Sequence, residues 1–123
     1  MNIPDNLYYT NDHEWVLINN SIATIGITDY AQKELGDIIF IEFTSIGGKY
    51  EYGDAMGTIE AVKTVADLFS PMRGSILEVN MKLEDDPTPV NTDPYENGWI
   101  IKLNISSNDV SHLLTPDQYK ELI

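Results

Sequence analysis

A single lysine separates two short segments of alternating apolar residues near the middle of the chain. The segments run from Met56 to Val62 and from Val65 to Phe69, and a Ser-Pro-x-x-Gly turn at 70–74 follows the second. Such alternation is typical of half-buried strands, so the pattern predicts a β-hairpin with Lys63 at its tip. A modifying enzyme could reach an ammonium group there, although spacing alone favours an ordinary solvated loop lysine.

Short β-branched and aromatic segments bounded by turn residues predict further strands on both sides of this hairpin. The expected strands are Glu14–Ile18, Ile22–Ile25, Ile38–Phe43, Lys49–Tyr52, Ser75–Val79 and Trp99–Leu103. Because Glu42 is the only charge in residues 38–43, we expect both faces of that strand to be largely covered. Many short strands with frequent turns predict a mainly β fold, a small sandwich or flattened barrel of antiparallel sheets.

Helix signals are fewer. Thr28 or Asp29 can cap a short helix that ends at Gly36, with Gln32 closing a capping box on Asp29. A second short helix is expected from Ser107 or Asn108 to Leu113. Thr115, Pro116 and Gln118 predict the start of a C-terminal helix. Residues 82–97, rich in Asp, Pro and Asn, are expected to form an extended surface loop.

Composition excludes several classes of protein. With 123 residues, the chain is expected to form one domain, 1–123. Its net charge of −13 disfavours nucleic acid and anionic membranes and suits basic protein partners. No cysteine is present, which excludes thiolate nucleophiles and fits the cytoplasm. The N-terminus lacks a signal-peptide pattern, and no apolar segment approaches the length of about 18 residues needed to span a membrane.

The sequence contains no recognisable catalytic constellation. Its two histidines, His13 and His112, show no metal-binding spacing, and a structural role is expected for both. His13 and Glu14 are neighbours on a predicted strand and should point to opposite faces. The acidic stretch Glu84-Asp85-Asp86 lacks the alternation of a calcium loop. The residues themselves therefore indicate a protein that is not an enzyme.

Several motifs, taken in order, resemble the glycine cleavage system H protein family over nearly the whole chain. They include Tyr9-Thr10-x-x-His13-Glu14-Trp15-Val16, Gly26-Ile27-Thr28-Asp29-Tyr30-Ala31-Gln32, Leu35-Gly36-Asp37-Ile38, Glu60-Ala61-Val62-Lys63, Ser70-Pro71-x-x-Gly74, Val90-Asn91-x-Asp93-Pro94-Tyr95 and Gly98-Trp99-Ile100-Ile101-Lys102. The resemblance implies the sandwich of lipoyl and biotinyl domains, called the hammerhead type, with short peripheral helices and a C-terminal helix.

The resemblance also assigns roles to individual residues. Lys63 matches the lysine that carries lipoic acid through an amide, and Glu60 matches the glutamate that lipoyl-attaching enzymes recognise. Asp12, Glu14 and Asp67 match positions of a cleft that holds the loaded arm. Ala61 departs from the serine more common in the family, and Asp12 also often appears there as serine.

The implied function is that of a lipoyl carrier of the glycine cleavage system. It would carry the aminomethyl group of glycine from the glycine decarboxylase to the aminomethyltransferase, with dihydrolipoyl dehydrogenase reoxidising the arm. A lipoyl donor that supplies other lipoyl domains remains an alternative, because both roles need a lipoylated Lys63. A biotin carrier is disfavoured, since Val62 and Thr64 stand where biotin domains place methionines. We expect a monomer, because a carrier must enter several active sites.

Overall fold

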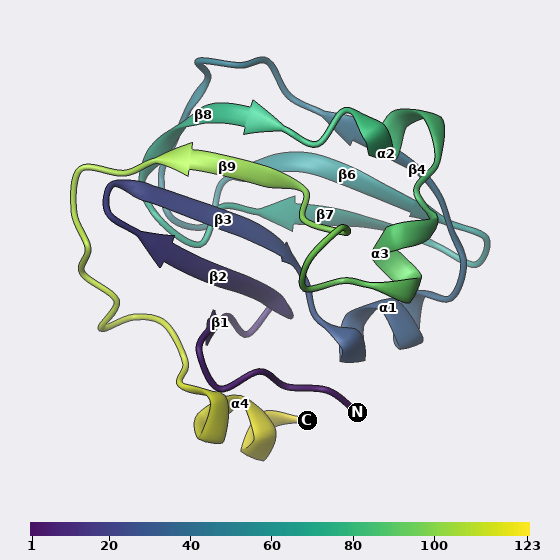
Figure 1. The fold of residues 1–123 in the computed structure, drawn as a ribbon, viewed down its shortest axis with the longest axis horizontal. Coiled ribbons are helices and arrows are strands. Elements are labelled where there is room, and N and C mark those ends of the chain that lie inside the picture. Colours follow the sequence, from purple (N-terminus) through teal and green to yellow (C-terminus); the bar gives the residue numbers. More distant parts are fainter.

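Two antiparallel β-sheets face each other in the structure, a computed structural model that describes residues 1–123 (Figure 1). The strands are β1 (Tyr8–Tyr9), β2 (Glu14–Asn19), β3 (Ile22–Ile27), β4 (Ile38–Phe43), β5 (Lys49–Tyr50), β6 (Ala55–Ala61), β7 (Val65–Phe69), β8 (Gly74–Val79) and β9 (Ile101–Asn104). One sheet has the order β1-β2-β3-β9-β8-β5, and the other has the order β4-β6-β7. The mainly β sandwich expected from the sequence is therefore confirmed.

The main core lies between the two sheets. Val16 and Ile25 from the larger sheet and Ile59 and Leu68 from the smaller one belong to a single cluster of 21 buried residues. Removing these apolar side chains from water is the main force holding the sheets together. A second, smaller cluster contains Leu7, Tyr9, Trp15 and Tyr119.

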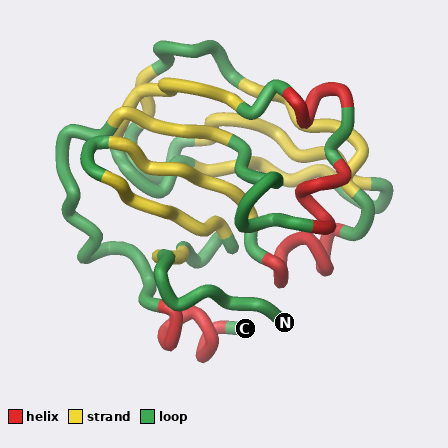
Figure 2. The backbone as a smooth tube through the Cα atoms, viewed as in Figure 1, coloured by secondary structure: helices red, strands yellow, loops and turns green.

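Four short helices lie outside the sheets, most of them at one end of the sandwich, as Figure 2 shows in red. Helix α1 (Asp29–Leu35) is capped by Thr28, whose hydroxyl accepts a hydrogen bond from the Ala31 amide, and ends at Gly36 with φ 77°. The expected capping box is wrong in detail, because Gln32 donates to the Asp29 side chain and not to the backbone of the cap. Helix α4 (Pro116–Leu122) has the predicted capping box at its first turn.

The region from 82 to 97 is a correction to the sequence-based expectation of an extended loop. It contains α2 (Lys82–Asp85) and α3 (Thr88–Thr92). Neither helix has a side-chain cap, so the usual start signal is absent from the sequence. Leu83 and Val90 are buried in the main core, which explains why these two turns form.

The helix expected at 107–113 is absent, which is a second correction. The Asp109 amide donates to the Ser107 hydroxyl at 3.2 Å, and the Ser111 amide donates to the Asp109 carboxylate at 3.0 Å. These local side-chain bonds offer the backbone an alternative to helical pairing. The segment therefore forms turns before α4.

Strand β4 is a third correction, because its outer face is open. Its register with β6 shifts between Ile38 and Phe40, as in a β-bulge. Ile39 and Phe40 are 54% and 44% exposed, although the apolar sequence predicted a covered strand. None of the helices is long and apolar enough to cross a membrane.

Candidate functional site: the Lys63 hairpin and an acidic cavity

Lys63 lies in the exposed turn between β6 and β7. The Ala61 amide donates to the Thr64 carbonyl at 2.8 Å and closes this turn. The Val62 amide donates to the Asp37 carbonyl at 3.1 Å, which joins the turn to the segment between α1 and β4. A β-carbon on Gly36 would lie 4.0 Å from Cδ and Cε of Lys63, so the lysine stem runs past this glycine. The turn between β6 and β7, which carries Lys63, is thus a supported tip, and it lies at the same end of the molecule as α1 (Figure 1).

Glu60 stands on the outer face of the smaller sheet, three residues before Lys63. Its neighbours across the strands are Phe40 on β4 and Val65 on β7. Val65 is 58% exposed, and Phe40 is also accessible. A carboxylate between two exposed apolar side chains can offer a partner protein both charge and contact area.

The three acidic residues that the resemblance assigns to an arm cleft line one cavity of about 150 Å³. Asp12 comes from the turn before β2, Glu14 is the first residue of β2, and Asp67 comes from β7. The other lining residues are His13, Ile27, Ala31, Glu34, Leu35, Ile59 and Ala66. Leu35, in the cavity wall, is followed in sequence by Gly36, which lies beside the Lys63 stem. Apolar walls with acidic groups suit an aliphatic chain that ends in a cation.

Glu14 is the buried member of this group, with only 1% of its surface exposed. Its Oε1 accepts from the Thr10 hydroxyl at 2.8 Å, and its Oε2 accepts from the Phe69 amide at 3.0 Å. Burial raises the pKa of Glu14 to about 8, although both hydrogen bonds oppose the shift. The neutral acid is therefore favoured near pH 7 unless a cation enters the cavity.

Asp12 and Asp67 are exposed, unlike Glu14. The turn before β2 places Asp12 and Glu14 together. Thr10 organises this turn, since its hydroxyl accepts from the amides of Asp12 and Glu14, each at 3.2 Å. Thr10 is thus a residue of the site that no catalytic or binding pattern in the sequence indicates. Its position in the Tyr9-Thr10-x-x-His13-Glu14 motif was the available signal.

His13 and Glu14 both line the cavity, but their side chains have different hydrogen-bond partners, in line with the expectation that they do not converge as a pair. His13 precedes β2 and has a positive φ of 65°, which takes it out of strand alternation. Its Nδ1 lies 2.9 Å from the Tyr119 hydroxyl, which also lies 2.7 Å from the Thr28 hydroxyl. Burial lowers the pKa of His13, while nearby Asp12 and Glu34 oppose this effect. Through Tyr119, helix α4 thereby holds the turn before β2 and the N-terminal cap of α1.

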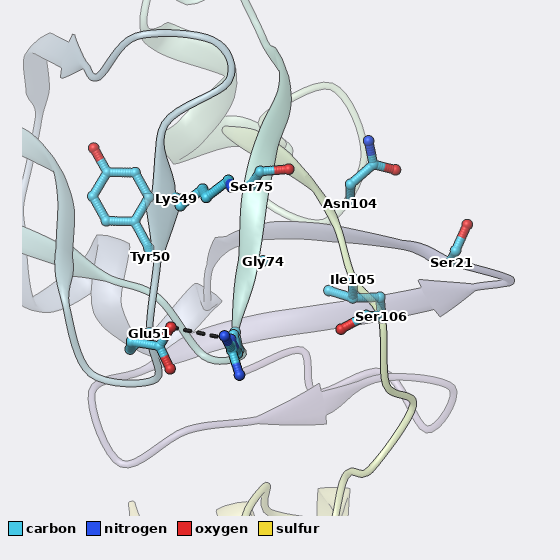
Figure 3. Close-up of a pocket in the computed structure, with 10 residues that line it drawn as sticks. Ser21, Lys49, Tyr50, Glu51, Gly74, Ser75, Asn104, Ile105 and Ser106 are labelled. Carbon is cyan, nitrogen blue, oxygen red and sulfur yellow. Dashed lines mark ion pairs between the residues drawn. The ribbon is translucent and has the colours of Figure 1, made fainter.

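A separate hollow of about 540 Å³ lies between β5 and the ends of β8 and β9 (Figure 3). Arg73 Nε pairs with Glu51 Oε2 there at 3.1 Å. None of the predicted site residues lines this hollow. No group of three or more acidic or histidine side chains in the structure could hold a metal ion.

Comparison with known proteins agrees with this architecture. A family model described as "Glycine cleavage H-protein" matches residues 7–123. Proteins named "Glycine cleavage system H protein" from Staphylococcus epidermidis and Chlorobaculum parvum are 48% and 54% identical, over 100% of this chain and 98% of each relative. The crystal structure of a glycine cleavage system H protein from Mycobacterium marinum gives a TM-score of 0.90 at 36% identity, covering 97% of both chains.

These findings establish the class of fold first, a two-sheet sandwich of the lipoyl and biotinyl type with short peripheral helices. The full-length matches then decide the family. The chain belongs to the glycine cleavage H-protein family. The resemblance read from the sequence motifs is confirmed.

Proposed function

We propose that this protein is a single-domain carrier, 1–123, that bears lipoic acid as an amide on Lys63 Nζ. Family membership supports a lipoyl-carrier role in glycine cleavage. The observation that carries the assignment of Lys63 is its exposed position at a hairpin tip held by the Asp37 carbonyl. The bound lipoyl group supplies the dithiol chemistry, and the protein contributes position, reach and shelter.

The proposed cycle involves three partner enzymes. The arm receives the aminomethyl group of glycine at the glycine decarboxylase, delivers it to the aminomethyltransferase and is reoxidised by dihydrolipoyl dehydrogenase. Amide formation removes the charge of Lys63, and the lysine stem adds length to the arm. A cytoplasmic location and a monomeric state stay predictions.

The acidic cavity would hold the amine at the end of the loaded arm. Its apolar residues, such as Leu35 and Ile59, can contact the aliphatic part of the arm. Glu14 and Asp67 would pair with the cationic amine, and Asp12 would add negative charge at the mouth. Holding the arm in this cavity excludes water from the labile group.

A double substitution tests this role. Glu14→Ala with Asp67→Ala should hasten hydrolysis of the aminomethyl-loaded carrier by about tenfold, the loss expected from roughly 1.4 kcal/mol of retention. Glu84→Ala with Asp85→Ala on α2 is the matched control, because it removes two carboxylates that do not line the cavity. An unchanged hydrolysis rate in the cavity variant would refute arm retention by these residues.

Glu60 is the proposed contact for the lipoyl-attaching enzyme. Glu60→Ala should lower kcat/KM for lipoylation by about tenfold, a loss in the range of a charged hydrogen bond. Glu42→Ala is a close control, since Glu42 is also exposed on the smaller sheet, two residue pairs further from the hairpin tip. Equal effects of the two substitutions would argue against recognition of Glu60.

One paired assay distinguishes carrier from relay. The lipoylated protein should support glycine–CO₂ exchange by the glycine decarboxylase, while lipoyl transfer from it to a second lipoyl domain serves as the competing readout. Exchange without transfer supports the carrier role. Transfer without exchange supports the relay. Biotin attachment to Lys63 in place of lipoate would support the biotin alternative.

A further inference from the structure

Asn91, on α3, contacts the segment that supports the Lys63 turn. Its Oδ1 accepts from the Ile38 amide at 2.9 Å, and its Nδ2 donates to the Gly36 carbonyl at 2.9 Å. Nδ2 also donates to Gln32 Oε1 on α1 at 3.0 Å. One carboxamide thus joins α1, α3 and the beginning of β4.

The Asn91 side chain bonds to the backbone of residues 36–38 much as a neighbouring strand would. In extended backbone, the carbonyl of one residue and the amide two positions later point to the same side. The Gly36 carbonyl and the Ile38 amide likewise both face Asn91, although the chain bends at Asp37, and β4, which begins at Ile38, is an edge strand of the smaller sheet. Asn91 therefore supplies the acceptor and donor that a neighbouring peptide group would supply, and it covers an edge that would otherwise be unpaired.

The opposite side of the same segment holds the hairpin. The Asp37 carbonyl, between the two residues bound by Asn91, accepts from the Val62 amide at 3.1 Å. Gly36 also lies beside the Lys63 stem, since a β-carbon added to Gly36 would be 4.0 Å from Cδ and Cε of Lys63. Asn91 on one side and the lysine turn on the other thus share the three-residue segment Gly36–Ile38.

We propose that Asn91 is a positioning residue for Lys63, holding the Gly36–Ile38 segment against which the modified turn is docked. Asn91 forms no hydrogen bond with Lys63 and does not line the arm cavity, so its proposed effect on Lys63 passes through this segment. The inference rests on the proposed function insofar as Lys63 is the lipoylated residue. The docking of the turn itself can be measured without any modification.

The first measurement is hydrogen exchange of the Val62 amide in the unmodified protein. Asn91→Ala should increase its exchange rate by about tenfold relative to the wild type, since two backbone bonds of the supporting segment are lost. Asn91→Asp keeps the acceptor for Ile38 and nearly the same volume but loses both donated bonds. It should also raise exchange at Val62, and it provides a second variant if the alanine variant folds poorly.

Asn80→Ala is the matched control. Asn80 also bridges backbone segments, donating to the Asn97 and Trp99 carbonyls at 3.0 and 2.8 Å, but it does not contact the hairpin or its support. This variant should lose stability without faster exchange at Val62. Exchange at Val62 that rises equally in Asn80→Ala and Asn91→Ala, or in neither, would overturn the proposal.

The second measurement is lipoylation by a ligase that uses a lipoyl adenylate. Asn91→Ala should raise the KM for the acceptor protein about fivefold with little change in kcat, because ordering a mobile turn is a cost of binding. A wild type that is not modified at Lys63 would refute the proposed function while leaving the exchange result valid. If the wild type is modified at Lys63 and Asn91→Ala has the same KM as the wild type, the positioning role alone is refuted.

Discussion

Glu14 is a buried carboxyl without a cationic partner. The three ion pairs of the protein join Lys33 to Asp29, Arg73 to Glu51 and Lys120 to Asp5, all away from the cavity. An uncompensated buried carboxylate is costly, which is why burial raises the pKa of Glu14 to about 8. A cation entering the cavity would therefore favour loss of the Glu14 proton. Retention of a cationic amine and ionisation of Glu14 are linked.

This linkage predicts a specific pH dependence of stability. The pKa of Glu14 rises from 4.5 to about 8 on folding, so between these values the native state binds more protons than the unfolded state. The Glu14 contribution to the free energy of unfolding consequently falls as pH rises through this window. Glu14→Gln should remove that loss, so its free energy of unfolding should rise relative to that of the wild type by about 4 kcal/mol between pH 5 and pH 9.

Urea unfolding at the two pH values measures this difference. The exposed carboxylate variant Glu84→Gln serves as the control for general changes in surface charge. A Glu14→Gln variant whose unfolding free energy parallels that of wild type from pH 5 to pH 9 would contradict the buried, proton-binding state of Glu14.

The sequence predicts some residues of the site but not the contacts that connect them. Lys63, Glu60 and Glu14 lie within recognisable motifs, and the structure brings Asp12, Glu14 and Asp67 to one cavity. The contacts of Asn91 were not predictable, because they join residues 53 to 59 positions apart. Such contacts depend on tertiary packing and leave no local spacing pattern.

At the scale of elements, two threonine caps have different surroundings. Thr115 caps α4 on the surface through the Gln118 amide at 3.2 Å. Thr28 caps α1, is fully buried and also contacts the Tyr119 hydroxyl at 2.7 Å. Their first-turn geometry is similar, so replacing the two threonines should lower the free energy of unfolding by different amounts because only Thr28 is buried.

Thr115→Ala should lower the free energy of unfolding by about 1 kcal/mol, the usual cost of losing a cap. Thr28→Ala should cost about 2–3 kcal/mol, because it also leaves Tyr119 with one partner fewer in a buried position. Chemical denaturation of both variants measures the difference. Equal losses would show that the Thr28–Tyr119 contact does not stabilise the packing of α4.

The elements predicted well are those with strong local signals. Strand β7 and helix α4 have the expected start residues, because alternation and a capping box specify them locally. Helices α2 and α3 were missed because they have four and five residues and no side-chain cap. Their formation depends on burying Leu83 and Val90 in the shared core, which no short window of sequence reveals.

At the scale of the whole molecule, a net charge of −13 dominates long-range behaviour. Such a charge accelerates encounter with basic surfaces and is screened by salt over a Debye length of about 10 Å at 0.1 M. If the proposed partners present basic surfaces, the KM of the glycine decarboxylase for this carrier should rise roughly tenfold between low salt and about 0.3 M salt.

Initial rates of glycine–CO₂ exchange at varied carrier concentration provide this KM. Sucrose at matched viscosity controls for slower diffusion. The KM for glycine, measured at saturating carrier, is the second control, because its salt response does not depend on the encounter with the carrier. A KM for the carrier that stays constant with salt would mean that overall charge does not guide the encounter.

In the fold as a whole, the supported turn between β6 and β7, which carries Lys63, lies at one end of the two-sheet sandwich (Figure 1). Intact-mass measurement with peptide mapping of the protein, isolated from cells supplied with lipoate, tests this account most directly. We predict a mass increase of one lipoyl group that maps to Lys63 and is absent from Lys63→Arg. Unmodified Lys63 in a fully folded protein, or a lipoyl group on another lysine, would contradict the account.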